Sequence, residues 1–430
     1  MSLKSARVLI VGAGPVGLVT ALLLNEQGLD VEIVDEQWRG TTRSYGLALH
    51  ASSLELLDSI GVAEELVQTG IPCRHLSFCD ASGPRCEIDF GLLDGPFPFV
   101  LILPQSVLEK RLEKELKDRG VNVRWNHRVE TVEQANGVVT TQIDRLTKES
   151  FGYSISHTEW IVEETFDFKS EFLIGADGHR SAVRRALGTQ FISRGDPSVF
   201  AIFEFSGFPL QKRPCRIHTL LTESGDGSLW PVKDGQFRWS FEIPFASEAE
   251  ERQKERLFVQ FRDRAFPHVD GTELEKLISE RAPWSEISVG EIAWSAMVQF
   301  EKRLVDRFGR NRVWLIGDAA HLFGPLGTQS MNVGFLEGAD LSRAIATHVQ
   351  SGGSGELNSF SEQLEENLRD RWETIFGLRE RVRASTSTND WVRQHAGQIA
   401  TAIPATGPHL SSLLPQAGLS LQQFSHSSSA

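Results

Sequence analysis

The sequence has few cysteines and no excess of basic residues. Its four cysteines, Cys73, Cys79, Cys86 and Cys215, form no CxxC pair and no zinc-ligand spacing. We therefore expect reduced thiols, a cytoplasmic location and no metal site. Acidic residues outnumber basic ones by 57 to 44, which gives a formal net charge of -13. Without a basic block or stripe to offset that charge, a nucleic-acid partner is disfavoured.

Long hydrophobic runs are also missing. The longest, over residues 8–24, is interrupted by Gly12, Gly14, Pro15 and Gly17 and is followed by no signal-peptide cleavage site. It is also short for a membrane span, so we expect no integral membrane segment. The hydrophobic fraction of 40% and the charged fraction of 23% are those of a soluble globular protein. A chain of 430 residues is long enough for two domains.

Hydrophobic periodicity predicts an α/β fold that begins with a βαβ unit. Residues 7–11 and 31–34 are predicted strands, and a helix is predicted between them over 18–27. The turn Asn136-Gly137 predicts a hairpin within a strand-rich region. Further helices are predicted over 52–59, 105–119 and 360–383, with another ending near 348, and further strands within 121–169 and 200–245 and over 313–317.

The first chemical motif is the glycine turn Gly12-Ala-Gly-Pro-Val-Gly17, between the first strand and the first helix. Glycine adopts the φ values that such a turn needs, and a helix N-terminus attracts a pyrophosphate. Asp35 ends the second strand, where a carboxylate can hold a ribose hydroxyl. Strand, turn, helix and acid together predict a dinucleotide site, and the alternative is a tight structural turn.

Two later motifs also place an aspartate after a buried strand. Asp177 lies in Phe172-Leu-Ile-Gly-Ala-Asp-Gly-His-Arg-Ser-Ala-Val-Arg184, and Asp318 lies in Val313-Trp-Leu-Ile-Gly-Asp-Ala-Ala-His321. A helix expected to begin near Met331 can direct backbone amides at an anionic ring or phosphate. Each motif alone is also compatible with an ordinary strand–turn–helix corner.

In this order and at these separations, the three motifs resemble those of the single-component (group A) FAD-dependent aromatic hydroxylases, the para-hydroxybenzoate hydroxylase family. The resemblance covers about residues 7–345. It implies that FAD is bound through Gly12, Gly14, Pro15, Gly17, Asp35, Arg43, Gln105, Asp177, Asp318, Pro325, Gly327, Met331 and Asn332.

The resemblance also implies roles for these residues. The glycines would hold the pyrophosphate, Asp35 the ribose and Asp318 the ribityl chain, while Asp177 would serve both FAD and NAD(P)H. Backbone amides of residues 327–332 would contact the isoalloxazine. NAD(P)H would reduce the flavin, and O2 would form a C4a-hydroperoxide. The hydroperoxide would hydroxylate an aromatic, phenolic or polycyclic, possibly polyketide-like, substrate.

The chain departs from the family pattern beside the expected isoalloxazine. The family commonly has glycine where this chain has Thr328 and Ser330, and aspartate where it has Glu337. A β-carbon restricts φ, and the β-branched Thr328 is the harder of the two to accommodate. Ser330 could instead donate a hydrogen bond.

Catalytic side chains are harder to assign, because oxygen transfer from a flavin needs no protein nucleophile. Arg216 and His218 lie at i and i+2 of a predicted strand and are candidates to favour a phenolate. The alternative is a solvated pair at a strand edge. Trp239 is either a pocket wall or a core residue.

Other functions on the same fold stay open. Trp239-Ser-Phe-Glu-Ile-Pro244 is close to a motif of flavin-dependent halogenases, but no lysine lies between Arg43 and Glu109 to handle hypohalous acid. A non-oxygenating flavin oxidoreductase and a non-catalytic flavoprotein partner are further alternatives. We expect a monomer or homodimer.

The positions of the motifs predict a discontinuous cofactor domain. We predict a Rossmann-like FAD-binding domain from residues 1–75, 100–185 and 290–350. An inserted β-rich substrate domain would consist of residues 76–99 and 186–289. Residues 351–430 would form a helical C-terminal segment with a flexible tail.

Overall fold

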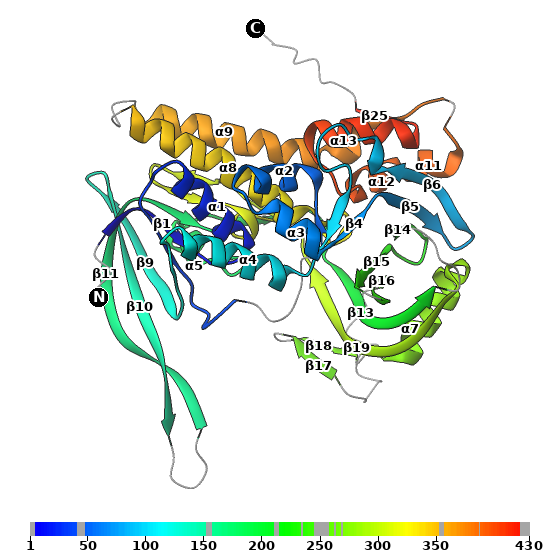
Figure 1. The fold of residues 1–430 in the computed structure, drawn as a ribbon, viewed down its shortest axis with the longest axis horizontal. Helices are drawn as coiled ribbons and strands as arrows, with labels where there is room; N and C mark the ends of the chain where they lie inside the picture. The colour runs from blue at the N-terminus through cyan, green and yellow to red at the C-terminus, as the bar shows by residue number, and fades with distance from the viewer. Residues whose placement is uncertain are drawn as a thin grey trace.

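The structure is a computed structural model, and two large sheets dominate it (Figure 1). It describes residues 5–40, 48–151, 157–209, 215–233, 235–244, 258–261, 264–267, 270–351, 357–386 and 388–421. The mixture of helices and sheets confirms the predicted α/β class.

The first large sheet has eight strands and contains the predicted βαβ unit. Its main path runs β21-β22-β11-β1-β2-β8, and β1 pairs in parallel with both β11 and β2. Its strands are β1 (Ser5–Val11), β2 (Val31–Val34), β8 (Val123–Arg124), β9 (His127–Ala135), β10 (Val138–Phe151), β11 (His157–Gly175), β21 (Gly309–Arg310) and β22 (Val313–Leu315). Buried apolar runs such as Val8–Val11 and Phe172–Ile174 suit strands that are covered on both faces.

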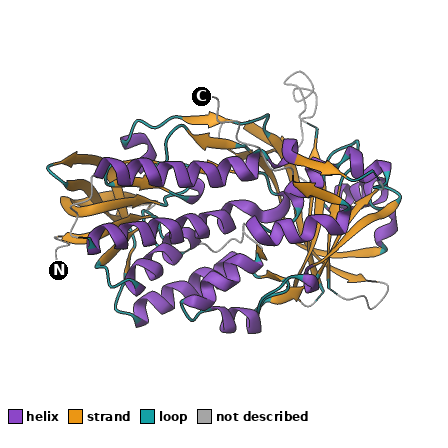
Figure 2. Ribbon diagram, turned by 90° about the horizontal axis from the view of Figure 1, so that it is seen from above, coloured by secondary structure: helices purple, strands orange, loops and turns teal. Residues whose placement is uncertain are grey.

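Helices cover this sheet, and two of them cross unusually closely. α1 (Pro15–Glu26) begins three residues before the predicted start, because Pro15 is well suited to a first helical turn. It packs on α8 (Gln329–Gln350), where a Cβ at Gly338 would lie 2.3 Å from Thr20 Oγ1. α4 (Gln105–Asp118) packs on α1, and α9 (Leu357–Phe376) packs on α8. Figure 2 shows the long helices side by side.

The second large sheet has seven strands in the order β19-β13-β16-β15-β14-β5-β6. They are β5 (His75–Asp80), β6 (Gly83–Asp89), β13 (Ser198–Pro209), β14 (Arg216–Leu220), β15 (Gly227–Lys233), β16 (Gln236–Ile243) and β19 (Ile287–Phe300). One face packs on α7 (Gly271–Arg281), whose N-terminus is capped by Asp270 accepting from Thr272 N and Glu273 N.

Smaller elements connect the two sheets. One three-stranded sheet consists of β3 (Ala48–Leu49), β7 (Val100–Ile102) and β4 (Ile71–Cys73), and another of β12 (Phe191–Ser193), β20 (Arg303–Val305) and β23 (His321–Leu322). A two-stranded sheet consists of β17 (Phe258–Phe261) and β18 (Arg264–Pro267). The helices are α2 (Ala51–Ser59), α3 (Ala63–Thr69) and α5 (Ala182–Ala186). Within the described ranges, no helix has the length and hydrophobicity to cross a bilayer.

The C-terminal segment is largely helical, as predicted. After α9 come α10 (Leu378–Arg381), β24 (Val382–Ala384), α11 (Asp390–Gln394), α12 (Ala396–Ala402), α13 (Gly407–Leu413) and β25 (Leu419–Leu421). Ile399 and Leu413 share a hydrophobic core with Leu76 and Phe78 of the seven-stranded sheet. The segment is therefore part of the packed molecule, and the tail predicted beyond residue 421 lies outside the described residues. The predicted domain boundaries remain a prediction.

The hairpin predicted at Asn136-Gly137 is present. Val138 pairs with Ala135, and the two turn residues have φ of 51° and 77°. Positive φ at both positions matches the twist of a tight hairpin. Beyond their pairing with β9, β10 and β11 continue together away from the rest of the molecule (Figure 1).

Candidate functional site

The glycine turn has two positions at which the protein itself excludes a side chain, and one that faces open space. A Cβ at Gly12 would lie 2.3 Å from Ala176 O, and one at Gly17 would lie 1.9 Å from Gly12 O. At Gly14, by contrast, nothing lies within 4 Å of the Cβ position. Gly12 and Gly17 are therefore required by packing, while Gly14 leaves room for an approaching group at the N-terminus of α1.

Asp35 connects the end of β2 to this turn. Its Oδ2 accepts from Ala13 N at 2.7 Å and its Oδ1 from Gln37 N at 2.7 Å. Burial raises the pKa of Asp35, and the two backbone hydrogen bonds oppose that shift. The carboxylate lies beside the glycine turn and each oxygen can accept a further hydrogen bond, as ribose binding would need.

Asp177 lies directly behind the glycine turn, because its neighbour Ala176 contacts Gly12. Its Oδ2 accepts from Ala182 N at 2.7 Å and Val183 N at 3.2 Å, at the start of α5. Burial raises the pKa of Asp177 despite these bonds. Its Oδ1 is buried and has no hydrogen-bond partner among the described residues. An acceptor in that state can take a hydrogen bond from a ligand.

Arg184, at the end of the second motif, joins it to the third. Its guanidinium is buried and donates to Ala319 O at 2.7 Å and His179 O at 2.6 Å. The side chain also lies over the ring of Phe191, at 4.0 Å from its centroid. The sequence motif contains this arginine but indicates no role for it, because its partner carbonyl is 135 residues away.

Asp318 lies next to a buried acid–histidine pair. Its side chain is exposed to solvent, and the surrounding protein atoms raise the pKa of its carboxyl group. Behind it, Glu337 Oε2 accepts from Gly317 N at 2.9 Å and lies 2.9 Å from His321 Nε2. Glu337 thus fixes the turn that presents Asp318.

The loop before α8 contains the departures from the family pattern. Gly327 has φ of 75°, and Thr328 has φ of 49° and ψ of 44°. A β-branched residue in this left-handed conformation is an outlier, which explains why glycine is usual there. His50 Nε2 lies 2.9 Å from Gly327 O and 3.3 Å from Thr328 Oγ1, and so holds the loop. Ser330 Oγ accepts from Phe323 N at 3.2 Å.

Asn332 fixes the same loop to the chain after β3. Its amide oxygen accepts from His50 N at 2.9 Å and Ser53 Oγ at 2.7 Å. Its amide nitrogen donates to Ala48 O at 3.0 Å and Thr328 O at 2.8 Å. All four hydrogen-bonding positions of the side chain are therefore used within the protein.

His50 and Asn332 together hold the loop before α8, and we call these two residues the clamp. The sequence motifs assign no role to His50, and its ring is neutral. Burial lowers the pKa of His50 to about 3. The neutral ring donates from Nε2 to Gly327 O, so its Nδ1 is an acceptor, and that atom has no partner among the described residues. No sequence motif marks this histidine, because its partner lies 277 residues away.

The structure also describes three other expected cofactor residues, Pro325, Met331 and Gln105. Pro325 and Met331 are half-buried in the loop and first turn of α8. Gln105 begins α4 and donates to Glu109 Oε1 at 2.8 Å. Gln329 donates to Ile403 O at 2.9 Å, so the C-terminal segment also contacts the loop. Arg43 lies outside the described residues.

The three candidate catalytic residues lie on the α7 side of the seven-stranded sheet. Trp239 is fully buried in one core cluster with Leu274 and Leu277 of α7, and stacks on Phe241 at 5.0 Å, as expected of a core residue. His218 pairs in register with Leu229, which pairs with Trp239, so it shares that face.

Arg216, two residues before His218 on the same face, forms an ion pair with Glu87 and donates to Ser77 Oγ at 2.8 Å. β14 lies between β15 and β5, so the pair is not at a sheet edge as the alternative supposed. The face opposite α7 packs on the C-terminal segment through Leu76, Phe78 and Trp230.

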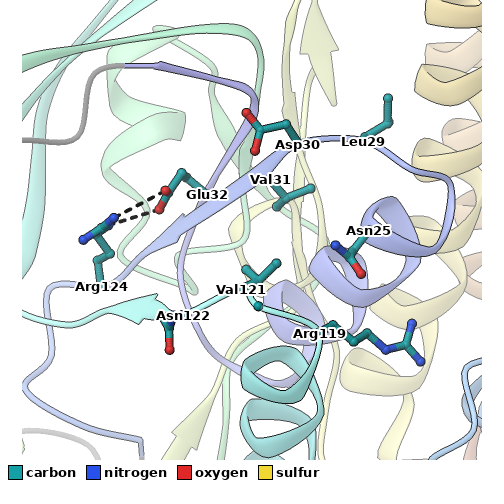
Figure 3. Close-up of a pocket in the computed structure, with 10 residues that line it drawn as sticks. Asn25, Leu29, Asp30, Val31, Glu32, Arg119, Val121, Asn122 and Arg124 are labelled. Atoms are coloured by element: carbon teal, nitrogen blue, oxygen red, sulfur yellow. Dashed lines mark hydrogen bonds and ion pairs between the residues drawn. The ribbon is translucent and has the colours of Figure 1, made fainter. Parts of the chain in front are cut away.

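A surface pocket shown in Figure 3 is separate from this site. It is lined by Asn25, Leu29, Asp30, Val31, Glu32, Arg119, Gly120, Val121, Asn122 and Arg124. Arg124 Nε donates to Glu32 at 3.1 Å within it. None of the lining residues belongs to the three motifs, so we assign it no part in cofactor binding.

The geometry has a counterpart in a known family. The family model described as FAD binding domain matches residues 5–367. The chain belongs to this family. FAD is accordingly its cofactor, and the residues fit that group: Gly14 leaves space at a helix N-terminus, and Asp177 Oδ1 is a buried acceptor with no partner among the described residues.

Curated relatives share about a quarter of their residues with the chain. A 12-dehydrotetracycline 5-monooxygenase/anhydrotetracycline 6-monooxygenase of Streptomyces rimosus is 27% identical over 354 residues, which cover 81% of this chain and 64% of the relative. Para-nitrophenol 4-monooxygenase of a Pseudomonas species is 26% identical, with 81% of this chain and 79% of the relative covered. The chain therefore spans less than two thirds of the tetracycline enzyme.

Solved structures share the fold. A p-nitrophenol 4-monooxygenase from Pseudomonas putida has a TM-score of 0.70 at 20% identity, with 96% of this chain and 99% of that chain covered. A flavin-dependent halogenase has a TM-score of 0.69 at 19% identity, with 88% and 64% covered. Because both chemistries occur on it, the fold alone does not choose between them.

Proposed function

We propose that the chain is an FAD-dependent monooxygenase that uses NAD(P)H and O2 to hydroxylate an aromatic, phenolic or polycyclic substrate. The observation that carries the proposal is the convergence of Gly14, Asp177, Asp318 and the 325–332 loop at one site. The names of the relatives support it, since they include monooxygenases of nitrophenol and of tetracycline precursors. The absence of lysine between Arg43 and Glu109 speaks against the halogenase alternative.

In this proposal the residues of the chain bind and orient. The amides at Gly14 and the start of α1 hold the pyrophosphate, and Asp35 accepts from the ribose. Asp318, whose side chain is exposed, accepts from the ribityl chain. The bound FAD supplies the electron transfer from NAD(P)H to O2.

Residues 325–332, which form the loop before α8 and its first turn, would contribute charge stabilisation. Their backbone amides at the start of α8 would face the flavin ring and favour negative charge on it. His50 and Asn332 keep these amides in place from the other side. Asp177 would link FAD binding to reduction by NAD(P)H, so Asp177→Ala should retain part of the FAD and reduce it more slowly.

The test is consumption of NADH or NADPH by the FAD-loaded protein with a panel of phenols, quinones and polycyclic aromatics, under ¹⁸O2. The proposal expects at least one compound to stimulate consumption and to gain one ¹⁸O atom. Stimulated consumption with an oxidised but unlabelled product would indicate a non-oxygenating oxidoreductase instead. A flavin that neither nicotinamide reduces would indicate a non-catalytic flavoprotein. We also propose a cytoplasmic location, as the composition suggests.

A further inference from the structure

The loop before α8 packs against the end of α12, although Gln329 and Ile403 are 74 residues apart in the chain. Gln329, the first residue of α8, is buried, and its Nε2 donates to Ile403 O at 2.9 Å. A Cβ at Gly327 would lie 2.6 Å from Thr401 O, so α12 excludes a side chain at this position. Leu326 packs on the hydrophobic cluster that contains Ile403. The loop therefore contacts this part of the C-terminal segment through both its backbone and its side chains.

The amide of Gln329 has one orientation that these surroundings accept. Its Nε2 faces two backbone carbonyls, that of Ile403 at 2.9 Å and that of Ala405 at 3.5 Å. A carbonyl oxygen only accepts, so the amide nitrogen and not the amide oxygen must lie there. The oxygen, Oε1, is buried and has no hydrogen-bond partner among the described residues. The position therefore requires a hydrogen-bond donor, which a methionine or a glutamate side chain would not supply.

The loop needs support because its backbone is strained. Gly327 and Thr328 both have positive φ, and a β-branched residue in that conformation persists only where its surroundings hold it. The clamp binds the backbone carbonyls of these two residues. α12 meets the loop at other atoms, namely the Cα of Gly327 and the side chain of Gln329. The clamp and α12 are therefore two separate supports of the same loop.

The end of α12 is itself fixed in the core of the protein. Ile399 and Ile403 are fully buried in the cluster that also contains Leu76 and Phe78 of the seven-stranded sheet. Ile403 O also accepts from Ala405 N at 2.8 Å, which closes a turn after the helix. The family match ends at residue 367, so this support comes from a part of the chain beyond the match.

We infer that Gln329 is a positioning residue that raises the reduction potential of the bound flavin by fixing the loop before α8 against the end of α12. The inference rests on the proposed function, in which the backbone amides of this loop face the flavin ring. Amides held in place favour the added negative charge of the reduced ring more than amides that must reorganise. The C-terminal segment thus acts on the flavin through the loop.

The test measures the midpoint potential of bound FAD by absorbance, during gradual reduction beside a dye of known potential. Gln329→Met keeps the length of the side chain and removes the donor to Ile403 O. It should weaken the preference of the protein for reduced over oxidised FAD about tenfold, which lowers the two-electron midpoint potential by about 30 mV. Neither substrate nor NAD(P)H is present, so the readout is independent of turnover.

Gln416 offers a matched control in the same C-terminal segment. Its Nε2 donates to Asp89 O at 3.0 Å and its Oε1 accepts from Asp89 N at 2.7 Å, at the end of β6. Gln416→Met should lower stability in urea unfolding, as Gln329→Met should, but leave the potential unchanged. Gln329→Asn keeps the amide on a shorter side chain and should lower the potential by less. It also keeps the test usable if Gln329→Met does not fold.

Several results would overturn the inference. They are an unchanged or higher potential in both Gln329 variants, an equal fall in Gln416→Met, or folded wild-type protein that binds no FAD. The measurement also separates this inference from the proposed function. The expected potentials in a protein that hydroxylates no compound would support the role of Gln329 and count against monooxygenase activity. Hydroxylation with unchanged potentials would do the reverse.

Discussion

Removal of the Asn332 side chain should destabilise the protein even when no FAD is bound. Asn332→Ala leaves the His50 N–H and the Ala48 carbonyl without their partners, and both residues are almost fully buried. Each buried group left unpaired costs about 1–3 kcal/mol, so the two cost about 2–6 kcal/mol. That is a large part of the roughly 5–15 kcal/mol that stabilises an ordinary domain.

Urea unfolding of the FAD-free proteins, followed by circular dichroism, measures this loss. Ser53→Ala removes only one of the donors to Asn332 and leaves its other bonds, so it should cost about 1 kcal/mol. FAD affinity of Asn332→Ala should also fall, because the loop before α8 loses its anchor. An FAD-free variant as stable as wild type that nevertheless fails to bind FAD would refute the clamp, since Asn332 would then act on the cofactor directly.

Three further predictions concern the cofactor site. Gly17→Ala should lower both the melting temperature and FAD affinity, because its Cβ would lie 1.9 Å from Gly12 O, whereas Gly14→Ala should keep the melting temperature of the FAD-free protein and weaken only FAD binding. Asp318→Ala should weaken FAD binding about tenfold to a hundredfold in a fluorescence titration, because a charge-assisted hydrogen bond contributes about 1.5–3 kcal/mol. The pKa of His50 lies near 3 when folded and near 6.5 when unfolded, so the unfolded chain binds the extra proton between these values. Stability should therefore be complete above pH 6.5 and fall toward pH 3 by up to about 1.4 kcal/mol per pH unit, and urea unfolding of His50→Gln should lack that component.

The sequence predicted the elements whose signals are local. The βαβ unit follows from apolar runs interrupted by a glycine turn, and the hairpin follows from Asn136-Gly137. The first helix begins three residues before its hydrophobic periodicity predicts, because the periodicity begins at Leu18 while Pro15 already forms the first turn.

Relations across the chain could not be predicted in the same way. Side chains alternate between the two faces of a strand, so the sequence shows that Arg216 and His218 share a face of β14. It does not show which face α7 covers, because α7 begins at Gly271, more than fifty residues later in the chain. The clamp of Asn332 joins residues 282 apart, and no local pattern marks it. The register that places Glu204 opposite both Arg238 and Trp294 is likewise set by tertiary packing.

FAD binding is the central claim, and a stoichiometric titration tests it most directly. The purified protein is denatured, released flavin is quantified, and the FAD-free protein is titrated with FAD while flavin fluorescence is followed. We predict one FAD per chain and the absorbance of a bound flavin. Denatured protein that releases no FAD, together with FAD-free protein of native circular dichroism that binds none, would contradict the account.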